Sequence, residues 1–224
     1  MKTGVVIPAY NVEAALADVL EGVCSFVPAD QVVVVDDGSC DQSAGVAGTW
    51  DVNTIIHTDN RGKGAALATG FSYFLERDFD WIVTLDGDGQ HLPEMLPDFI
   101  RTARTTTGDI ILGQRCFTLN TMPWDRFCSN FISSLCVSLL SGTSIRDSQC
   151  GYRIISCNLL KNIDLETRHY EAETELLIKA VWAGWKVGFC EIPVVYNDSN
   201  SSINRIRDMY RFCRLCVSLL CKWR

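Results

Sequence analysis

The stretch Ile82-Val-Thr-Leu-Asp86-Gly-Asp88-Gly-Gln90-His91 carries the strongest structural signal of the 224-residue chain. Its first half is apolar and β-branched, which is typical of a buried strand, and this strand ends at two carboxylates. Side chains two residues apart on an extended backbone leave the same face, roughly 6–7 Å apart. Asp86 and Asp88 can therefore address one small cation such as Mg²⁺ or Mn²⁺, which favours oxygen ligands. A solvated turn with two capping aspartates is the alternative interpretation of this motif taken alone.

A second acidic strand end lies upstream, at Asp36-Asp37-Gly38-Ser39, after the apolar run from Gln31 to Val35. A carboxylate at such a strand end can accept a hydrogen bond from a nucleobase N–H or a ribose hydroxyl. A helix N-cap is the alternative, but a cap needs only one such side chain. Two adjacent acids therefore favour ligand binding for at least one of them.

Apolar strands alternate with helical patterns from the N-terminus to residue 115. This alternation indicates a parallel sheet covered by helices on both faces. Because the carboxyl ends of parallel strands meet at one edge, the two acidic clusters should converge on one crevice. We predict strands at 5–7, 31–35, 54–56, 81–85 and 110–112, and helices over 13–25, 41–48, 64–77 and 93–104.

Beyond residue 115 the alternation ends, and longer amphipathic patterns follow. They predict helices over 127–140, 171–184 and 203–223, and a late strand pair over 187–195 that is interrupted at Pro193.

Charge divides the chain into an acidic domain over residues 1–200 and a basic amphipathic helix over 201–224. The first part holds 14 basic and 26 acidic residues, a net charge of −12, whereas the second holds six basic residues against one acid. An acidic body lacks the basic footprint of a nucleic-acid binder, so no nucleic-acid partner is expected. The terminal helix can lie at an anionic membrane surface. Packing on the domain or on a second subunit is the alternative, which leaves a homo-oligomer open.

The eleven cysteines are an odd number, and no signal peptide precedes the first predicted strand. We therefore expect reduced thiols in a cytoplasmic protein. No segment reaches the roughly 18–20 apolar residues that a membrane span needs.

Further charged residues are expected near the crevice. Asn60-Arg-Gly-Lys-Gly64 is neither a P-loop nor a dinucleotide fingerprint, but it can start a helix while presenting Arg61 and Lys63. Arg115, at the end of the fifth strand, can clamp a phosphate or form a surface ion pair. His91 is more typical of a structural residue than of a ligand. Acids recur at Asp147, in a loop that leads into Ile154-Ile155, and at Glu171, Glu173 and Glu175, which the helix dipole would favour without any function.

Together these motifs resemble the family 2 glycosyltransferases, specifically the branch of polyprenyl- or dolichyl-phosphate sugar synthases. The resemblance spans about residues 4–195 in the expected order. It implies a GT-A fold, an α/β arrangement of a mostly parallel sheet flanked by helices, and a UDP- or GDP-linked sugar donor. The matching segments are Val6-Ile-Pro-Ala-Tyr-Asn11, Val34-Val-Asp-Asp-Gly-Ser39, Asn60-Arg-Gly-Lys-Gly64, Asp86-Gly-Asp-Gly-Gln90, Gly113-Gln-Arg115, Asp147-Ser-Gln-Cys-Gly-Tyr-Arg153 and the helix of Glu173.

The resemblance also implies roles for single residues. Asp86, Asp88 and Gln90 would hold Mg²⁺ or Mn²⁺ on the diphosphate, and the sugar would be transferred with inversion at the anomeric carbon. Asp88, Arg115 and Asp147 are the candidate catalytic residues. The nucleotide site would consist of Pro8, Tyr10, Asn11, Asp36, Asp37, Lys63, Asp86 and Gly87.

The acceptor decides what else the site requires. A polyprenyl phosphate is already an anionic nucleophile and needs positioning, for which Arg115, Arg126 and Arg205 are candidates. A hydroxyl acceptor needs a general base, for which Asp147 is the first choice. We expect transfer to a polyprenyl phosphate by a protein peripheral on the cytosolic face of a membrane. The alternatives are transfer to a saccharide hydroxyl in cell-surface glycan synthesis and a non-catalytic nucleotide-sugar-binding module.

Overall fold

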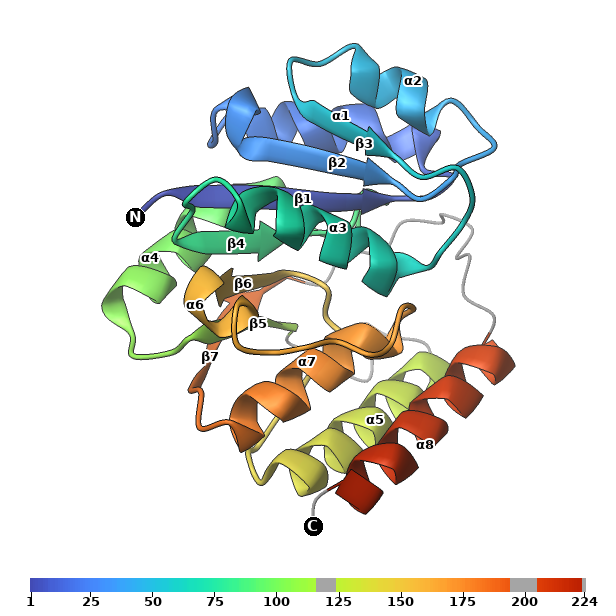
Figure 1. The fold of residues 1–224 in the computed structure, drawn as a ribbon, viewed down its shortest axis with the longest axis vertical. Helices are drawn as coiled ribbons and strands as arrows, with labels where there is room; N and C mark the ends of the chain where they lie inside the picture. The colour runs from blue at the N-terminus through green and yellow to red at the C-terminus, as the bar shows by residue number, and fades with distance from the viewer. Residues whose placement is uncertain (116–123, 194–204, 223–224) are drawn as a thin grey trace.

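The computed structural model describes the backbone of residues 1–115, 124–193 and 205–222, and their side chains except at 124–126, 205–206 and 222. Strands and helices alternate as far as β5, as the sequence predicts (Figure 1). The strands are β1 (Thr3–Ala9), β2 (Val32–Asp36), β3 (Asn53–Ile56), β4 (Trp81–Thr84), β5 (Ile110–Arg115), β6 (Arg153–Ser156) and β7 (Val187–Ile192). The α-helices are α1 (Glu13–Cys24), α2 (Ser43–Gly48), α3 (Lys63–Leu75), α4 (Leu96–Thr105), α5 (Trp124–Ser141), α6 (Cys157–Leu160), α7 (Glu171–Trp182) and α8 (Arg205–Lys222), and Ala29–Gln31 and Pro93–Met95 form short 3-10 turns.

The strands form one sheet in the order β3-β2-β1-β4-β6-β5-β7. Strands β1 to β4 are mutually parallel, β5 is parallel to β7, and β6 runs antiparallel to both β4 and β5. The sheet is therefore mixed but mostly parallel, which confirms the predicted α/β fold class. Because β6 reverses direction between β4 and β5, the carboxyl ends of β4 and β5 still lie on the same edge as those of β1 and β2.

Strand β6 and the short helix α6 that follows it are elements that the sequence analysis missed. Ile154-Ile155 was noted only as the apolar pair into which a loop leads, whereas Ile155 pairs with Ile82 of β4 and with Ile110 of β5. The strand has only four residues, so its apolar pair gives no periodicity of its own. The predicted late strand is confirmed as β7, and the part of that prediction beyond Pro193 lies outside the described residues.

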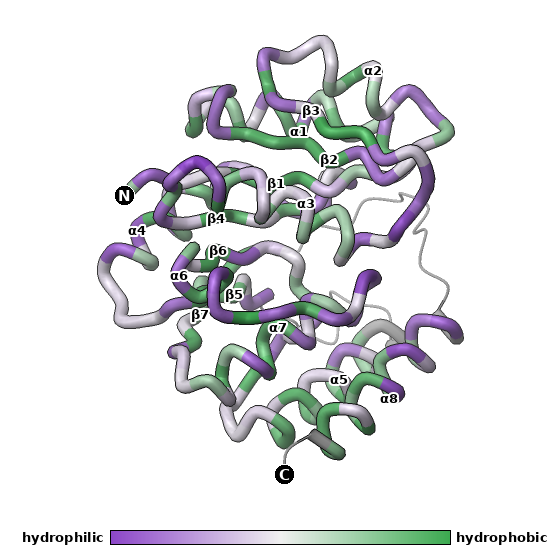
Figure 2. Tube along the Cα trace, in the orientation of Figure 1, coloured by the Kyte–Doolittle hydropathy of each residue, from purple (hydrophilic) through white to green (hydrophobic). Residues whose placement is uncertain are grey.

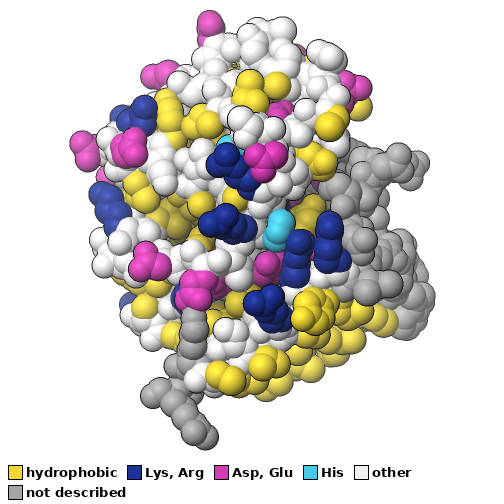
Figure 3. Space-filling view, turned by 45° about the vertical axis from the view of Figure 1, so that its right-hand side comes forward, with side chains coloured by type: hydrophobic (Ala, Val, Ile, Leu, Met, Phe, Trp, Pro, Cys, Tyr) yellow, Lys and Arg dark blue, Asp and Glu magenta, His cyan; other side chains and the backbone are white. Residues whose placement is uncertain are grey.

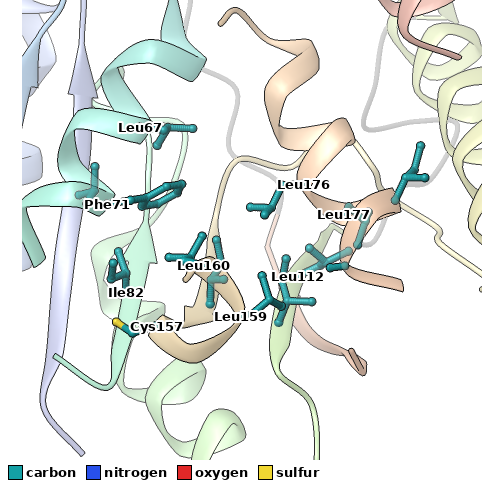
Figure 4. Packing of buried hydrophobic residues seen from close by; sticks show 14 of the residues in the cluster. Leu67, Phe71, Ile82, Leu112, Cys157, Leu159, Leu160, Leu176 and Leu177 are labelled. Carbon is teal, nitrogen blue, oxygen red and sulfur yellow. The ribbon is translucent and has the colours of Figure 1, made fainter. Parts of the chain in front are cut away.

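Side chains of alternate residues along each strand pack into two hydrophobic cores, one on each face of the sheet. Val5 faces the core formed with α1, α2 and α4, whereas its neighbour Val6 faces the core formed with α3, α5, α6, α7 and α8. In Figure 4, Leu67 and Phe71 of α3, Leu160 of α6 and Leu176 of α7 fill the space over this second face. The backbone trace in Figure 2 shows apolar colour along the strands of the sheet.

Helices α5 and α8 lie side by side at the end of the molecule remote from β3 and run in the same direction (Figure 1). Leu215 and Leu219 of α8 are buried with Val137 and Leu140 of α5, so the terminal helix packs on the domain. None of the described helices combines the length and the apolar character that crossing a membrane requires.

Candidate active site

Two consecutive residues, Gly62 at the end of the β3–α3 loop and Lys63 at the start of α3, connect the two acidic strand ends. The Gly62 N–H donates to Asp37 Oδ2 over 2.7 Å, and Lys63 Nζ lies 2.7 Å from Asp86 Oδ1. Gly62 has a φ of +100°, a conformation that glycine adopts without strain. The carboxyl ends of β2 and β4 thus converge on one crevice, as the strand order requires.

Lys63 bridges two carboxylates at the centre of this crevice. Its Nζ lies 2.7 Å from Asp86 Oδ1 and 2.9 Å from Glu173 Oε2 at the start of α7. Burial alone would lower the pKa of Lys63, but the two carboxylates raise it above its ordinary value. Burial likewise opposes ionisation of Asp86, yet the Lys63 ammonium holds the pKa of Asp86 below its usual range. Lys63 and Asp86 are therefore both charged at neutral pH.

Lys63, Asp86 and Glu173 form an ion triad. Glu173 is the one of the three that was not among the candidate site residues predicted from the sequence. Of the three acids that open α7, it is the one that reaches Lys63, whereas Glu175 accepts hydrogen bonds from Glu166 and Thr167. Glu173 and Lys63 are far apart in the sequence, and the helix dipole alone explains acids at the start of α7. Only the fold shows which of them faces the crevice.

Asp88 stands two residues beyond Asp86 and is half-buried. Its Oδ1 accepts the Gln90 N–H over 3.0 Å, and burial together with the negative charge of Asp86 raises its pKa. His91 accepts the Asp86 N–H at Nδ1, and burial lowers the pKa of His91 to about 4. The imidazole is thus neutral and supports the backbone of Asp86, which agrees with the structural role expected for it.

The loop between α5 and β6 closes the crevice from the other side. Arg153 is buried, and its guanidinium donates to the carbonyls of Ser148, Cys150 and Glu173. A Cβ at Gly151 would lie 2.7 Å from Asp86 Oδ2 and 2.8 Å from Lys63 Nζ. Only glycine therefore allows this loop to approach the ion triad so closely.

Arg115 and Asp147 are brought together as a two-pronged ion pair. Arg115 Nε lies 2.7 Å from Asp147 Oδ2, and its second nitrogen lies 2.9 Å from Oδ1. The Asp147 side chain is buried, whereas Arg115 stays partly exposed. Both carboxylate oxygens of Asp147 are thus used to orient the guanidinium.

The residues predicted to bind the nucleotide lie at the carboxyl ends of β1, β2 and β4. Asp37 already has three partners, since it contacts His57 and accepts the N–H groups of Arg61 and Gly62. Asp36 is 1% exposed; its Oδ1 accepts the Ser39 N–H, while its Oδ2 finds no hydrogen-bond partner within the described part of the chain. A buried acceptor without a partner costs about 1–3 kcal/mol, so Asp36 Oδ2 is suited to receive a ligand donor.

The other residues predicted to bind the nucleotide either make structural contacts or flank the crevice. The Asn11 Oδ1 accepts the Cys40 N–H, and the Asn11 N–H donates to Ser39, so Asn11 clamps the turn after β2. The half-buried Pro8 and Tyr10 flank the end of β1, and a Cβ on Gly87 would lie 3.4 Å from the Pro8 carbonyl oxygen. The side chains of Arg126 and Arg205, the two further acceptor candidates, lie outside the described residues.

An open pocket of about 320 Å³ adjoins the crevice at the start of α3. Arg61 and Arg168 line it, together with His57 and Thr69. Arg61 was expected near the crevice. Arg168 was not singled out, because a lone arginine in a polar segment gives no sequence signal.

The carboxylate pair fits a divalent cation that arrives with a diphosphate. Among the described residues, no group of three or more His, Cys, Asp and Glu side chains could hold a metal alone. Mg²⁺ is commonly held by one or two carboxylates plus substrate phosphates and water, so Asp86 and Asp88 meet that need. Burial and, after it, the negative charge of Asp86 raise the pKa of Asp88, and a bound cation would relieve the repulsion between the two carboxylates.

Comparison with known proteins identifies the family of this chain. The glycosyl transferase family 2 model matches residues 4–161. The undecaprenyl-phosphate mannosyltransferase of Micrococcus luteus is 30% identical over 207 residues, covering 88% of this chain and 84% of that one. The polyprenol monophosphomannose synthase of Mycolicibacterium smegmatis is 28% identical over 217 residues, covering 92% and 81%.

Among solved structures, glucosyl-3-phosphoglycerate synthase from Mycobacterium tuberculosis, in complex with Mn²⁺, UDP and glucosyl-3-phosphoglycerate, superposes with a TM-score of 0.76. It is 18% identical and the match covers 98% of this chain and 78% of that one, which shows that the two share the GT-A fold. A model match over well more than half of the chain is decisive for the family. The chain belongs to glycosyl transferase family 2 and is a glycosyltransferase.

Proposed function

We propose that this protein transfers a sugar from a nucleotide-diphosphate donor to a polyprenyl phosphate, with inversion at the anomeric carbon. The observation that carries the proposal is the crevice in which Asp86, Asp88 and Lys63 meet at the carboxyl edge of the sheet. Relatives near 30% identity that are named for polyprenyl-phosphate acceptors support the choice of acceptor.

On the donor side, Asp86 and Asp88, with Gln90 beside them, would hold Mg²⁺ or Mn²⁺ against the diphosphate. A cation held there would supply positive charge to offset the charge that develops on the leaving diphosphate. Asp36 would accept a hydrogen bond from the nucleoside through Oδ2. Asp37 would shape the pocket through its hold on the backbone of residues 61–62, and Lys63 would balance the charge of Asp86. Pro8, Tyr10, Asn11 and Gly87 would complete the wall.

On the acceptor side, the Arg115–Asp147 pair favours a phosphate over a hydroxyl. The Asp147 side chain is fully buried and both of its oxygens accept hydrogen bonds from Arg115, so a hydroxyl acceptor does not reach it while that pair is intact. A phosphate monoester needs no base, only a cation that positions it. Arg115 is partly exposed and would supply this cation, with Arg126 and Arg205 as further candidates.

The acceptor's polyprenyl chain places the reaction at a membrane, and we propose the cytosolic face, where nucleotide sugars are available. The basic segment 201–224 supports peripheral binding, since each basic residue near an anionic surface contributes about 1 kcal/mol.

A transfer assay tests the proposal. Purified protein would be incubated with labelled UDP- and GDP-sugars and polyprenyl phosphate in detergent, with Mg²⁺, Mn²⁺ or EDTA. Label that enters the lipid fraction and is lost with EDTA would support the reaction and name the sugar. Metal-dependent donor turnover with no lipid labelling would refute the acceptor assignment and point to a saccharide hydroxyl. Nucleotide binding without any turnover would instead identify a non-catalytic module.

A further inference from the structure

Exposed apolar side chains gather on α5 and α8. Of the thirteen large apolar residues that are exposed among the described residues, eight lie on these two helices. Contiguous exposed apolar surface of this kind marks an interaction site rather than ordinary solvent-facing surface. The eight are Phe131, Ile132, Leu135 and Leu139 on α5, and Met209, Tyr210, Val217 and Leu220 on α8.

The two helices present one surface, because they pack side by side and parallel. In Figure 2 the C-terminal ends of both helices are coloured as apolar. Figure 3 shows apolar side chains along the lower part of the face on which α8 lies, with basic side chains beside them. We call the eight residues named above the α5–α8 surface.

Charge is distributed on this surface in a particular way. From Phe127 to Ser141, α5 contains no charged residue. The charge is supplied by α8, whose Arg207 and Arg214 are exposed, and the first 200 residues are net −12. The α5–α8 surface is thus an apolar strip edged by cations on an otherwise acidic molecule.

The first half of the inner face of α5 is polar, at Asn130, Ser133 and Ser134, and it leads back to the crevice. Ser134 Oγ contacts Asn130 and Ser148, and it accepts the Ser148 N–H over 2.9 Å. Ser148 follows Asp147, which holds Arg115. A helix whose outer side is apolar therefore connects, through short contacts, to the arginine proposed to position the acceptor.

We propose that α5 and α8 together dock the protein on an anionic lipid bilayer, with the apolar residues of both helices in the interface and the α8 arginines at the headgroups. The inference rests on the proposed function in one respect, namely that a lipid acceptor makes a bilayer the relevant partner. It goes beyond a basic terminal tail, because it makes the uncharged helix α5 an equal part of the membrane contact.

Charge favours a bilayer over a second copy of the chain. Two copies that met through this surface would bring their α8 arginines together, and like charges in an interface are repulsive. An anionic bilayer pairs with the same arginines, while the acidic remainder of the molecule is repelled from it. The surface is therefore complementary to anionic lipid and not to itself.

Vesicle flotation, without donor or acceptor, tests the docking surface independently of catalysis. Ile132→Glu is the test variant and Ile56→Glu on β3 is its matched control, since the two isoleucines are 59% and 62% exposed and lie on opposite parts of the molecule. We expect the parent protein to float with phosphatidylglycerol-containing vesicles. Ile132→Glu should bind about tenfold or more weakly, because burial of one large aliphatic side chain is lost, and Ile56→Glu should bind as the parent does.

A second variant isolates the electrostatic part. Arg207→Gln with Arg214→Gln should weaken binding to anionic vesicles roughly fivefold or more per arginine and leave binding to purely zwitterionic vesicles unchanged. Equal binding by Ile132→Glu and the parent would overturn the proposal. So would a parent dimer, seen by sedimentation without vesicles, that Ile132→Glu converts to a monomer while flotation is unaffected.

Failure of the proposed function remains distinguishable from failure of the docking surface. A short-chain polyprenyl phosphate in detergent requires no bilayer, so Ile132→Glu should transfer sugar to it at the parent's rate. Flotation of a parent protein that labels no lipid would refute the acceptor and leave the docking surface standing. Lipid labelling by a parent protein that does not float would refute the docking surface and leave the proposed acceptor standing.

Discussion

The crevice and the α5–α8 pair use buried polar groups in opposite ways. In the crevice, Lys63 is ionised against Asp86 and Glu173, and Arg153 is buried against backbone carbonyls. Behind α5 the buried polar groups are neutral hydroxyls and an amide, such as Ser134 and Asn130, while its outer side is apolar. Buried charge is costly to desolvate, and each charged group of the crevice is accordingly paired with an opposite charge or with backbone carbonyls. The crevice therefore holds charged groups at fixed positions, whereas the outer side of the helix pair presents apolar surface.

The largest expected effect removes a charge from the crevice without disturbing its packing. Asp88→Asn keeps the size of the side chain, and its Oδ1 can still accept the Gln90 N–H. We expect the transfer rate to fall by about 10²–10³-fold and metal-dependent donor binding to be lost, because the cation would lose an anionic ligand. Initial rates across a Mn²⁺ titration would measure this.

The control for this variant is Asp18→Asn, which removes an exposed aspartate of α1. It should leave rate, metal dependence and thermal unfolding unchanged. Normal turnover by Asp88→Asn would refute the assignment of the metal site to the end of β4.

The convergence of the acidic strand ends on one crevice was predictable from the sequence because its signals are local. Asp36, Asp37, Asp86 and Asp88 each end an apolar run, and parallel strands bring such ends to one edge. Arg115 was placed at that edge for the same reason. No local rule, however, identifies which partner a side chain will find across the fold.

Three features required the structure for this reason. The Lys63–Glu173 pair joins segments that are distant in the chain, so residue type and spacing could not reveal it. Asp147 was expected as a base for a hydroxyl acceptor, and the ion pair with Arg115 depends on how β5 and the loop before β6 meet. Strand β6 is too short to show a period.

The next largest effect tests the Arg115–Asp147 ion pair, which lies between the crevice and the polar contacts behind α5. Asp147→Asn should lower the free energy of unfolding by about 2–4 kcal/mol, because it leaves Arg115 without its buried counter-charge; the partial exposure of Arg115 keeps the loss below that of a fully buried pair. Urea unfolding would measure it.

Asp98→Asn is the matched control, since Asp98 pairs with Arg101 on the surface of α4. Exposed pairs of this kind contribute about 0–1 kcal/mol. An equal loss in the two variants would show that the Arg115–Asp147 pair is no more than a surface contact. Full stability of Asp147→Asn with abolished transfer to hydroxyl acceptors would instead support Asp147 as a base.

A smaller effect tests how tightly the crevice is closed. The added methyl group in Gly151→Ala would meet Asp86 Oδ2 and Lys63 Nζ at 2.7 and 2.8 Å, so the ion pair or the loop must move. We expect a loss of stability of about 1–3 kcal/mol together with weaker donor binding, measured by thermal unfolding and by nucleotide titration. Gly48→Ala, where no atom lies within 4 Å of the added carbon, is the control and should change neither. Unaltered donor binding by Gly151→Ala would mean that the loop does not form part of the donor site.

The smallest effect concerns an acid that opens α7 but does not reach the crevice. Burial opposes ionisation of Glu175, yet hydrogen bonds from Lys179 and Thr167 lower its pKa below the ordinary value. A depressed pKa contributes stability above the unfolded-state value of about 4.3, and that contribution is lost as the pH falls through the folded-state value. Glu175→Gln should therefore cost about 1–2 kcal/mol at pH 7, and the difference from the parent should shrink once the pH drops below about 4. Denaturant unfolding at several pH values would show this convergence.

A difference in the free energy of unfolding that stays constant with pH would mean that Glu175 acts through packing rather than through its charge. Transfer activity should be unchanged in either case, because Glu175 lies outside the crevice.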